Sequence, residues 1–325
     1  MYNYKRIFIL GSGFSKAISK KMPSMSELTE QLQSPAGNRY KELWDTVSYY
    51  KKQSNNSELL SVENVTSLIL GRQIFYNNDM HLHYRILKNQ IIHWLYEKID
   101  TAAHNVDNDK IQGVIDFIKG CAIGDRNGRK SLVMTFNYDL LLERLFNQYI
   151  ASPALNMNYV VKLRRYFDTD FGENNMSKEL QGTFQYLKLH GSFNWFRSPG
   201  SQNTNFDNVF LVTDSDQSRD LIHYDDTPVF IPMAYVKGIF LSGSFYNILW
   251  NIAWRYLETA DEIIFLGYGF PATDLDNMVC FLQFKDKIKH IVIKENNDKI
   301  QRLNNIFGSE KIINMDAYDY IVNMI

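Results

Sequence analysis

Short apolar stretches that end in glycine or a polar residue, each followed by helix-like sequence, recur along this chain. The stretches at 4–10, 131–136, 183–189, 262–266 and 289–293 have the length and composition of buried strands. The alternation of such strands with helix-like sequence is typical of a parallel sheet covered by helices on both faces. The sequence therefore predicts an α/β fold with a Rossmann-like parallel sheet.

The residues that follow these strands are small or polar. In such sheets ligands bind outside the carboxyl ends of the strands, so these residues should meet at one edge. Five strand ends of this kind together indicate a ligand site more strongly than any one of them does. The five strand ends are Gly11–Ser15, Asn137–Asp139, His190–Ser192, Gly267–Asp274 and Glu295–Asn297.

The remaining sequence is organised around this sheet. Residues of about 37–120 have apolar positions at helical spacing, which predicts a helical insertion after the first strand and helix. Residues 151–180 are expected to be irregular, and residues 197–227 to form a loop or hairpin. We expect a single catalytic domain over 1–325, with a last short strand beginning at Ile312.

One helix start has a specific signature. Ser24 is a plausible N-cap, and Glu27 follows three residues later. In this spacing the serine hydroxyl and the glutamate carboxylate each satisfy a backbone N–H of the first helical turn. We therefore predict a capping box at this position.

The charge balance excludes several functional classes. Lys and Arg number 35 against 36 Asp and Glu, so the net charge of -1 gives no overall attraction to nucleic acid or an anionic membrane. No stretch of about 18 consecutive apolar residues occurs, and the apolar run near the start is shorter than a secretory signal requires. We expect a reduced, cytoplasmic protein that meets nucleic acid only through a partner.

Metal binding has little support in the sequence. The two cysteines, Cys121 and Cys280, are too few for a four-cysteine zinc site or a disulfide framework. His81 and His83 diverge on an expected helix, and His93 lacks further obvious ligands. We predict no metal site.

The first strand end, Gly11–Ser15, has the sequence GSGFS. A G-x-G turn between strand and helix lets the backbone approach a phosphate at the helix N-terminus. The third glycine of the usual dinucleotide fingerprint would fall at Lys16 and is absent. A tight turn that serves packing explains this motif equally well when it is taken alone.

The other strand ends carry candidate catalytic and binding groups. Asn137 and Asp139 can face a ligand, although a cap of the helix near 140 is the better explanation of either residue alone. His190, before Gly191, can transfer a proton near neutral pH, whereas a single histidine is more often structural. The stretch Gly267–Asp274 again follows a strand and precedes a helix, and a second turn with a helix cap is its alternative.

Taken in order, these motifs resemble those of the sirtuin superfamily. The early PSMSEL, the stretch PVFIPMAYVKG and the tryptophan helix before GYGFPATD are similar to SIR2-like proteins of bacterial antiviral defence. The resemblance spans nearly the whole chain. Its motifs are GSGFS (11–15), TFNYD (135–139), LHGS (189–192), GYG (267–269) and IVIKEN (291–296).

The chain also departs from the sirtuin pattern. Sirtuin deacylases usually carry a four-cysteine zinc module after the histidine motif, and residues 193–266 contain no cysteine. Phe136 replaces the sirtuin glutamine, and Ser12 replaces the alanine of the first loop. Lys294 stands near the position of the family's ribose-binding asparagine.

The resemblance implies NAD+ as the substrate and no metal. It points to an NAD+ glycohydrolase that produces nicotinamide and ADP-ribose and depletes NAD+ in anti-phage defence by abortive infection. A deacylase or ADP-ribosyltransferase of the same fold stays open, as does a non-catalytic subunit that binds NAD+ or ADP-ribose. The resemblance does not distinguish hydrolysis of the substrate from its cyclisation, nor NAD+ from NADP+ as the preferred substrate.

The resemblance also implies roles for the strand ends. Asn137 would contact the nicotinamide ribose and position water, His190 would orient or deprotonate a ribose hydroxyl, and Asp139 would hold the carboxamide. The GSGFS loop would hold the pyrophosphate, and Glu295 would lie near the adenine ribose. The implied binding residues are Gly11, Ser12, Gly13, Phe14, Ser15, Thr135, Gly191, Gly267, Tyr268, Gly269, Asp274 and Glu295.

Regulation is expected to come from outside the catalytic domain. The motifs run along the whole chain, so no region is left for a fused sensor, and an unregulated NADase would be toxic. We therefore expect a separate sensor or activator subunit, or assembly into a homo- or hetero-oligomer.

Overall fold

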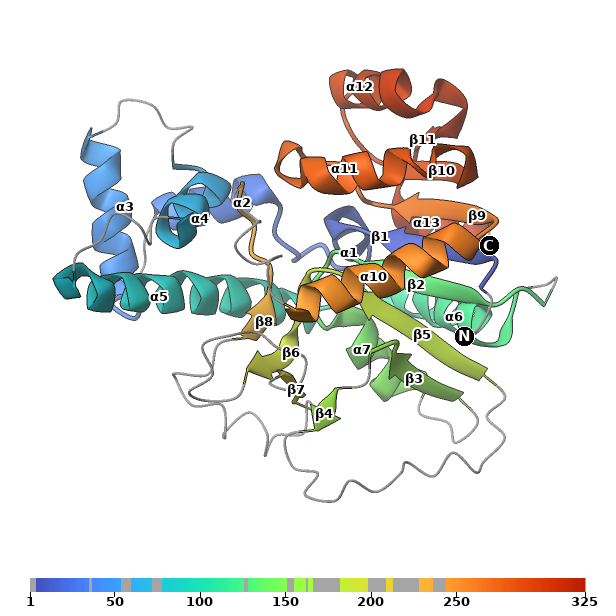
Figure 1. Ribbon diagram of the computed structural model, residues 1–325, viewed down its shortest axis with the longest axis horizontal. Coiled ribbons are helices and arrows are strands. Elements are labelled where there is room, and N and C mark those ends of the chain that lie inside the picture. The colour runs from blue at the N-terminus through green and yellow to red at the C-terminus, as the bar shows by residue number, and fades with distance from the viewer. Residues whose placement is uncertain are drawn as a thin grey trace.

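The predicted parallel sheet forms the centre of the protein, and it has seven strands (Figure 1). The computed structural model describes residues 4–34, 37–53, 60–71, 78–125, 128–150, 155–161, 163–165, 182–197, 209–212, 228–235 and 244–324. The strand order is β11-β10-β9-β1-β2-β5-β3, and all neighbours run parallel. The strands are β1 (Arg6–Leu10), β2 (Ser131–Thr135), β3 (Leu155–Tyr159), β5 (Gly182–Lys188), β9 (Glu262–Leu266), β10 (Ile288–Ile293) and β11 (Ile312–Asn314).

Both faces of the sheet are covered by helices, which explains why its central strands are apolar throughout. Phe8 and Leu10 of β1 belong to one apolar core, and Ile7 and Ile9 belong to a second core on the opposite face. The first core includes residues of α1 (Ser12–Ile18), α6 (Ile111–Ile123) and α13 (Ala317–Met324). The second includes residues of α10 (Ser244–Thr259), α11 (Leu275–Leu282) and α12 (Asn297–Phe307).

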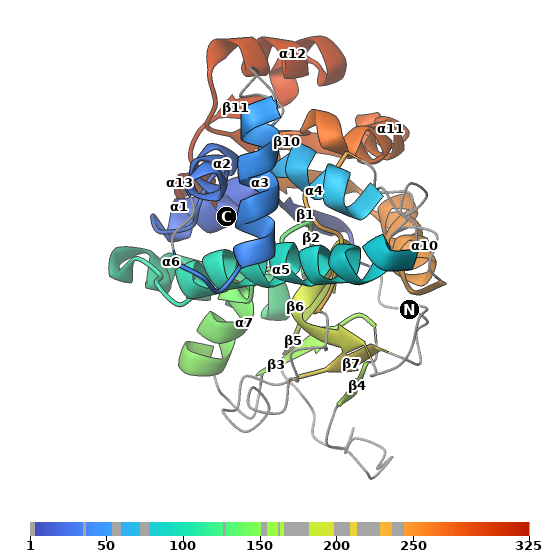
Figure 2. The ribbon, with the colours of Figure 1, turned by 90° about the vertical axis from the view of Figure 1, so that its left-hand side faces the viewer.

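The predicted insertion is helical where the structure describes it. It contains α3 (Lys41–Gln53), α4 (Val62–Gly71) and α5 (Asn78–Ala103), which lie together to one side of the sheet in Figures 1 and 2. The last part of the predicted range, from residue 111, does not belong to the insertion, because α6 packs directly on β2 and β5 of the sheet. The chain therefore returns to the sheet layer before residue 120.

A second sheet of four strands was not predicted from the sequence. It consists of β4 (Arg164–Arg165), β6 (Gly191–Arg197), β7 (Val209–Leu211) and β8 (Pro228–Phe230), in the order β4-β7-β6-β8. β6 pairs antiparallel with β7, so the hairpin alternative for this region is confirmed there. The expectation of irregular sequence is wrong for β3 and β4, and most of 166–181 and 198–227 lies outside the described residues.

The capping box at Ser24 is confirmed. Ser24 Oγ accepts a hydrogen bond from the Glu27 amide at 3.2 Å, and the Ser24 amide donates to Glu27 Oε2 at 2.6 Å. The box begins α2 (Met25–Gln33), and Lys16 of α1 lies 2.7 Å from the same carboxylate oxygen. These bonds hold the segment between α1 and α2 in place, and that segment forms part of the cavity described below.

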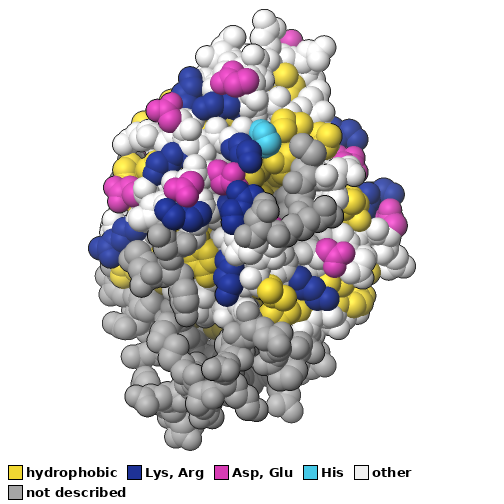
Figure 3. Space-filling view, turned by 90° about the vertical axis from the view of Figure 1, so that its right-hand side faces the viewer, with side chains coloured by type: hydrophobic (Ala, Val, Ile, Leu, Met, Phe, Trp, Pro, Cys, Tyr) yellow, Lys and Arg dark blue, Asp and Glu magenta, His cyan; other side chains and the backbone are white. Residues whose placement is uncertain are grey.

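The surface carries charges of both signs. On the face shown in Figure 3, Lys and Arg side chains alternate with Asp and Glu, in agreement with the net charge of -1. Within the part of the chain that the structure describes, no helix is long and apolar enough to cross a membrane.

Candidate functional site

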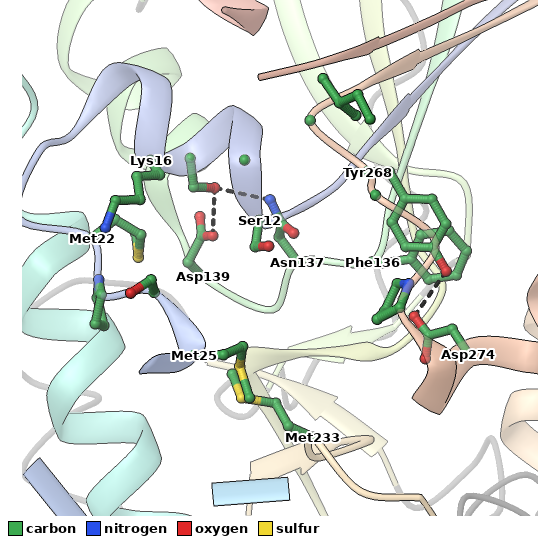
Figure 4. Close-up of a pocket in the computed structure, with 18 of the residues that line it drawn as sticks. Ser12, Lys16, Met22, Met25, Phe136, Asn137, Asp139, Met233, Tyr268 and Asp274 are labelled. Carbon is green, nitrogen blue, oxygen red and sulfur yellow. Dashed lines mark hydrogen bonds between the residues drawn. The ribbon is translucent and has the colours of Figure 1, made fainter. Parts of the chain in front are cut away.

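A cavity of about 730 Å³ opens at the carboxyl ends of β1, β2, β9 and β10. Its volume lies in the range of small-molecule and cofactor sites. Figure 4 shows Asn137 and Asp139 together on one wall, Phe136 and Tyr268 at one end, and Met25 beside Met233 on the facing side. Strand ends that are far apart in the sequence therefore meet at one site, as the order of the sheet requires.

Three glycines join the turn after β1 to the turn after β9. The Gly11 amide donates to the Leu266 carbonyl at 3.0 Å, and the Gly13 amide donates to the Gly267 carbonyl at 2.9 Å. A Cβ on Gly13 would lie 2.8 Å from the Gly267 oxygen, and one on Gly267 would lie 2.1 Å from the Phe14 nitrogen. The packing explanation of the G-x-G turn therefore holds, and two of its amides already donate within the protein.

Alanine at Gly267 is expected to lower the free energy of unfolding by about 2 kcal/mol or more. The residue has a φ of +68°, so a side chain there is strained and also meets the Phe14 nitrogen. Urea unfolding measures the loss. Gly128→Ala is the matched control, because Gly128 has a φ of +72° and nothing within 4 Å of an added Cβ. Equal losses in the two variants would contradict the role of the contact.

Asn137, Ser15 and Asp139 form one hydrogen-bonded group. Asn137 Nδ2 donates to the Gly11 carbonyl and to Ser15 Oγ, each at 2.9 Å, and Ser15 Oγ donates to Asp139 Oδ2 at 2.8 Å. A carbonyl can only accept, so the amide nitrogen of Asn137 faces Gly11 and its oxygen Oδ1 is left for the cavity. Asp139 Oδ1 accepts from the Leu141 amide, the first of α7 (Leu141–Leu145), at 3.1 Å, and Asp139 also lines the cavity.

His190 lies in the turn between β5 and β6 and is buried with 6% exposure. Its ring packs edge-on against the ring of Phe136, with the two ring centroids 4.8 Å apart, and its Nε2 lies 3.5 Å from Asn277 Nδ2 of α11. Gly191 has a φ of +82°, and a Cβ there would lie 2.1 Å from the Val229 oxygen of β8. The glycine after the histidine therefore lets β8 cross closely, which holds His190 at the cavity wall.

Tyr268 and Asp274 form a second buried pair. The Tyr268 hydroxyl donates to Asp274 Oδ2 at 2.8 Å, and the Tyr268 ring stacks on Phe136 at 4.5 Å. Burial raises the pKa of Tyr268 well above its usual value, although a hydrogen bond from Asn277 lowers it. The phenol therefore stays protonated at neutral pH and continues to donate.

A pair of oppositely charged residues lines the cavity beyond the carboxyl end of β10. Glu295 makes an ion pair with Lys299, one turn along α12. A Cβ on Gly269 would lie 2.7 Å from Lys299 Nζ, so the GYG turn packs against this lysine. Lys294, also at the wall, is exposed.

Eleven of the fifteen predicted site residues line the cavity, and four lie behind its wall. The four are Gly11, Phe14, Thr135 and Gly191, and Thr135 Oγ1 accepts from the Asn137 amide at 2.9 Å. The eleven are Ser12, Gly13, Ser15, Asn137, Asp139, His190, Gly267, Tyr268, Gly269, Asp274 and Glu295.

Several lining residues were not predicted as site residues. Most of them come from the segment between α1 and α2 and the start of α2, from the helical insertion and from the segment after β8, and tertiary packing brings these residues to the cavity. No spacing in the sequence connects the residues of the insertion with the strand ends, whereas Phe136 directly follows β2 within TFNYD. The lining residues that were not predicted include Met22, Met25, Glu63, Ile99, Phe136, Ile231, Met233 and Lys299.

No metal-binding group is found among the described residues, where no three His, Cys, Asp or Glu side chains gather in a suitable cluster. Both cysteines are free thiols, Cys121 buried and Cys280 partly exposed.

Comparison with known proteins gives the family. A solved structure of a Sir2 homologue with NAD is similar over 98% of this chain and 87% of that chain, with 14% identity and a TM-score of 0.45. One of Sir2 with a p53 peptide and NAD+ is similar over 97% and 90%, with 13% identity and a TM-score of 0.45. No curated protein matches significantly. The family model of a SIR2-like domain matches residues 131–312, more than half of the 325-residue chain, and the protein therefore belongs to the SIR2-like family.

Proposed function

We propose that this protein is an NAD+ glycohydrolase, which cleaves NAD+ to nicotinamide and ADP-ribose. Membership of the SIR2-like family supports a function related to NAD. The observation that carries the proposal is the arrangement of Asn137, whose NH2 group is held by Gly11 and Ser15 while its oxygen is left for the cavity that His190 also lines. An oriented acceptor in a cavity of this size is suited to position water at a sugar carbon.

The chemistry needs few groups. When the bond between nicotinamide and ribose breaks, its electron pair goes to the ring nitrogen, so nicotinamide leaves neutral and needs no general acid. The protein must orient the ribose, stabilise positive charge on it and admit water. In the proposal Asn137 positions the water, His190 orients a ribose hydroxyl or takes its proton, and Asp139 holds the carboxamide.

The remaining walls are assigned to the other half of the substrate. Ser12 and Gly13 face the cavity and would lie along the pyrophosphate. Tyr268 and Asp274 would line the adenosine half, and Glu295 would lie near its ribose. The amides of Gly11 and Gly13 donate within the protein, so side chains have a larger part in this proposal than in a glycine-loop phosphate site.

Mass spectrometry of the products tests the proposal directly. The purified protein is incubated with NAD+, with and without candidate partner proteins, and nicotinamide and ADP-ribose are expected in equal amounts. Turnover that depends on an acylated or acceptor protein would indicate a deacylase or ADP-ribosyltransferase instead. Cyclic ADP-ribose would indicate cyclisation, and stabilisation by NAD+ without turnover would indicate a binding subunit.

The proposed biological role is depletion of cytoplasmic NAD+ during phage infection. A separate sensor or activator subunit, or self-assembly, would restrain the enzyme until infection. NAD+ levels in infected cells that express the wild-type protein are expected to fall, and a monomer with full constitutive turnover in gel-filtration fractions would contradict the regulatory part.

A further inference from the structure

Glu63, in the first turn of α4, extends the cavity wall into the helical insertion. Its side chain is half-buried and lines the same cavity as Asn137 and His190. The backbone carbonyl of Glu63 accepts from Ser67 Oγ at 2.6 Å. Among the residues that the structure describes, no hydrogen bond or ion pair reaches its carboxylate.

The other acidic residues that line the cavity are all engaged. Asp139 accepts from Ser15 and from the Leu141 amide, and Asp274 accepts from Tyr268. Glu295 pairs with Lys299, and Asp316 Oδ1 accepts from the Tyr318 amide at 2.9 Å. Of the described carboxylates at this wall, Glu63 alone is left without such a partner, so its negative charge acts on whatever enters the cavity.

The charge of Glu63 acts at one end of the cavity. Burial, then the charge of Asp139, then that of Glu63 raise the pKa of Tyr138, which lies between Asn137 and Asp139. Glu63 lines the same cavity as Asn137 and Asp139, and its charge acts on the residue between them, where the proposed function places nicotinamide and its ribose. At the adenosine end, Lys299 balances the charge of Glu295.

We propose that Glu63 is a specificity-determining residue that recognises a cationic nitrogen heterocycle, which is the pyridinium ring of NAD+ if the proposed function holds. A carboxylate in a partly desolvated cavity favours a positive charge over a neutral group of the same shape. The ring is cationic before cleavage, and the released nicotinamide is neutral. Glu63 therefore favours binding of the substrate over retention of the product.

A binding experiment tests this without requiring turnover. Calorimetric titration of the full chain with N1-methylnicotinamide, a cation, and with neutral nicotinamide compares two ligands of nearly equal shape. Wild-type protein is expected to bind the cation roughly tenfold more tightly. Glu63→Gln, which keeps the size of the side chain, is expected to lose that preference.

Glu30→Gln is the matched control, because Glu30 is exposed on α2 and does not line the cavity. It should keep the wild-type preference. Three results would overturn the assignment. They are equal affinity of the wild-type protein for the two ligands, no binding of either ligand to the wild-type protein, and an unchanged preference in Glu63→Gln.

Kinetics separate this inference from the proposed function. If NAD+ is cleaved, Glu63→Gln is expected to raise KM roughly tenfold with a smaller change in kcat, since the carboxylate attracts positive charge before and during cleavage. If wild-type protein does not cleave NAD+ at all, the proposed function fails, while the two-ligand titration still decides the role of Glu63.

Discussion

Alanine at Asn137 is expected to lower kcat for NAD+ cleavage by about 100-fold or more, the usual effect of removing an oriented polar group from a reacting centre. The side chain bridges the Gly11 carbonyl and Ser15 Oγ through its NH2 group, which fixes the position of Oδ1. In the proposed reaction, water at the sugar carbon then loses its acceptor. KM should change less than kcat, because ground-state binding depends on many other contacts.

The matched control for this variant is Asn305→Ala. Asn305 is exposed on α12 and does not line the cavity, so wild-type kcat is expected. Thermal unfolding of both variants checks that the fold persists. Wild-type turnover in Asn137→Ala, measured by release of nicotinamide, would remove Asn137 from the mechanism.

Methionine at Lys188 is expected to lower the free energy of unfolding by about 3–5 kcal/mol. Lys188 is fully buried, and its Nζ lies 2.8 Å from Glu143 Oε1 and 2.6 Å from the Asp139 carbonyl oxygen. Tyr159 also donates to Glu143 Oε1 at 2.9 Å. Removing the cation leaves the Glu143 carboxylate buried without an opposite charge, which is the costly way to break a buried pair.

Urea unfolding of a double-mutant cycle measures this effect. Adding Glu143→Gln to Lys188→Met should recover part of the loss, because the buried charge is then absent. The exposed pair of Lys5 and Asp261, at 3.3 Å, supplies the contrast. Lys5→Met is expected to cost less than about 1 kcal/mol. Similar losses for Lys5→Met and Lys188→Met would contradict the argument from burial.

The central strands were predictable because both of their faces are buried. Sequences such as RIFIL in β1 and EIIFL in β9 are apolar at nearly every position. β3 was missed because its sequence, LNMNY, alternates between more and less exposed positions at the edge of the sheet. β6 was missed because it starts at Gly191, directly after a turn that resembled a strand end. Edge strands and tight turns thus lack the signal that burial gives.

The candidate site residues that directly follow strands could be identified from the sequence. Asn137, Asp139 and His190 follow strands of a parallel sheet, so the topology alone brings them together. The cap alternative for Asp139 has support, since one oxygen accepts from the Leu141 amide at the start of α7, while the other accepts from Ser15. Glu63 could not be predicted, because its place at the cavity depends on how the insertion packs against the rest of the chain.

The contact between the two glycine turns has a consequence for affinity. Because the backbones of Gly13 and Gly267 are hydrogen-bonded to each other, the spacing of these turns is set when the protein folds. Such preorganisation spares a ligand the entropy loss of ordering two loops separately. A ligand that contacts both turns therefore meets a spacing that is already fixed before it binds.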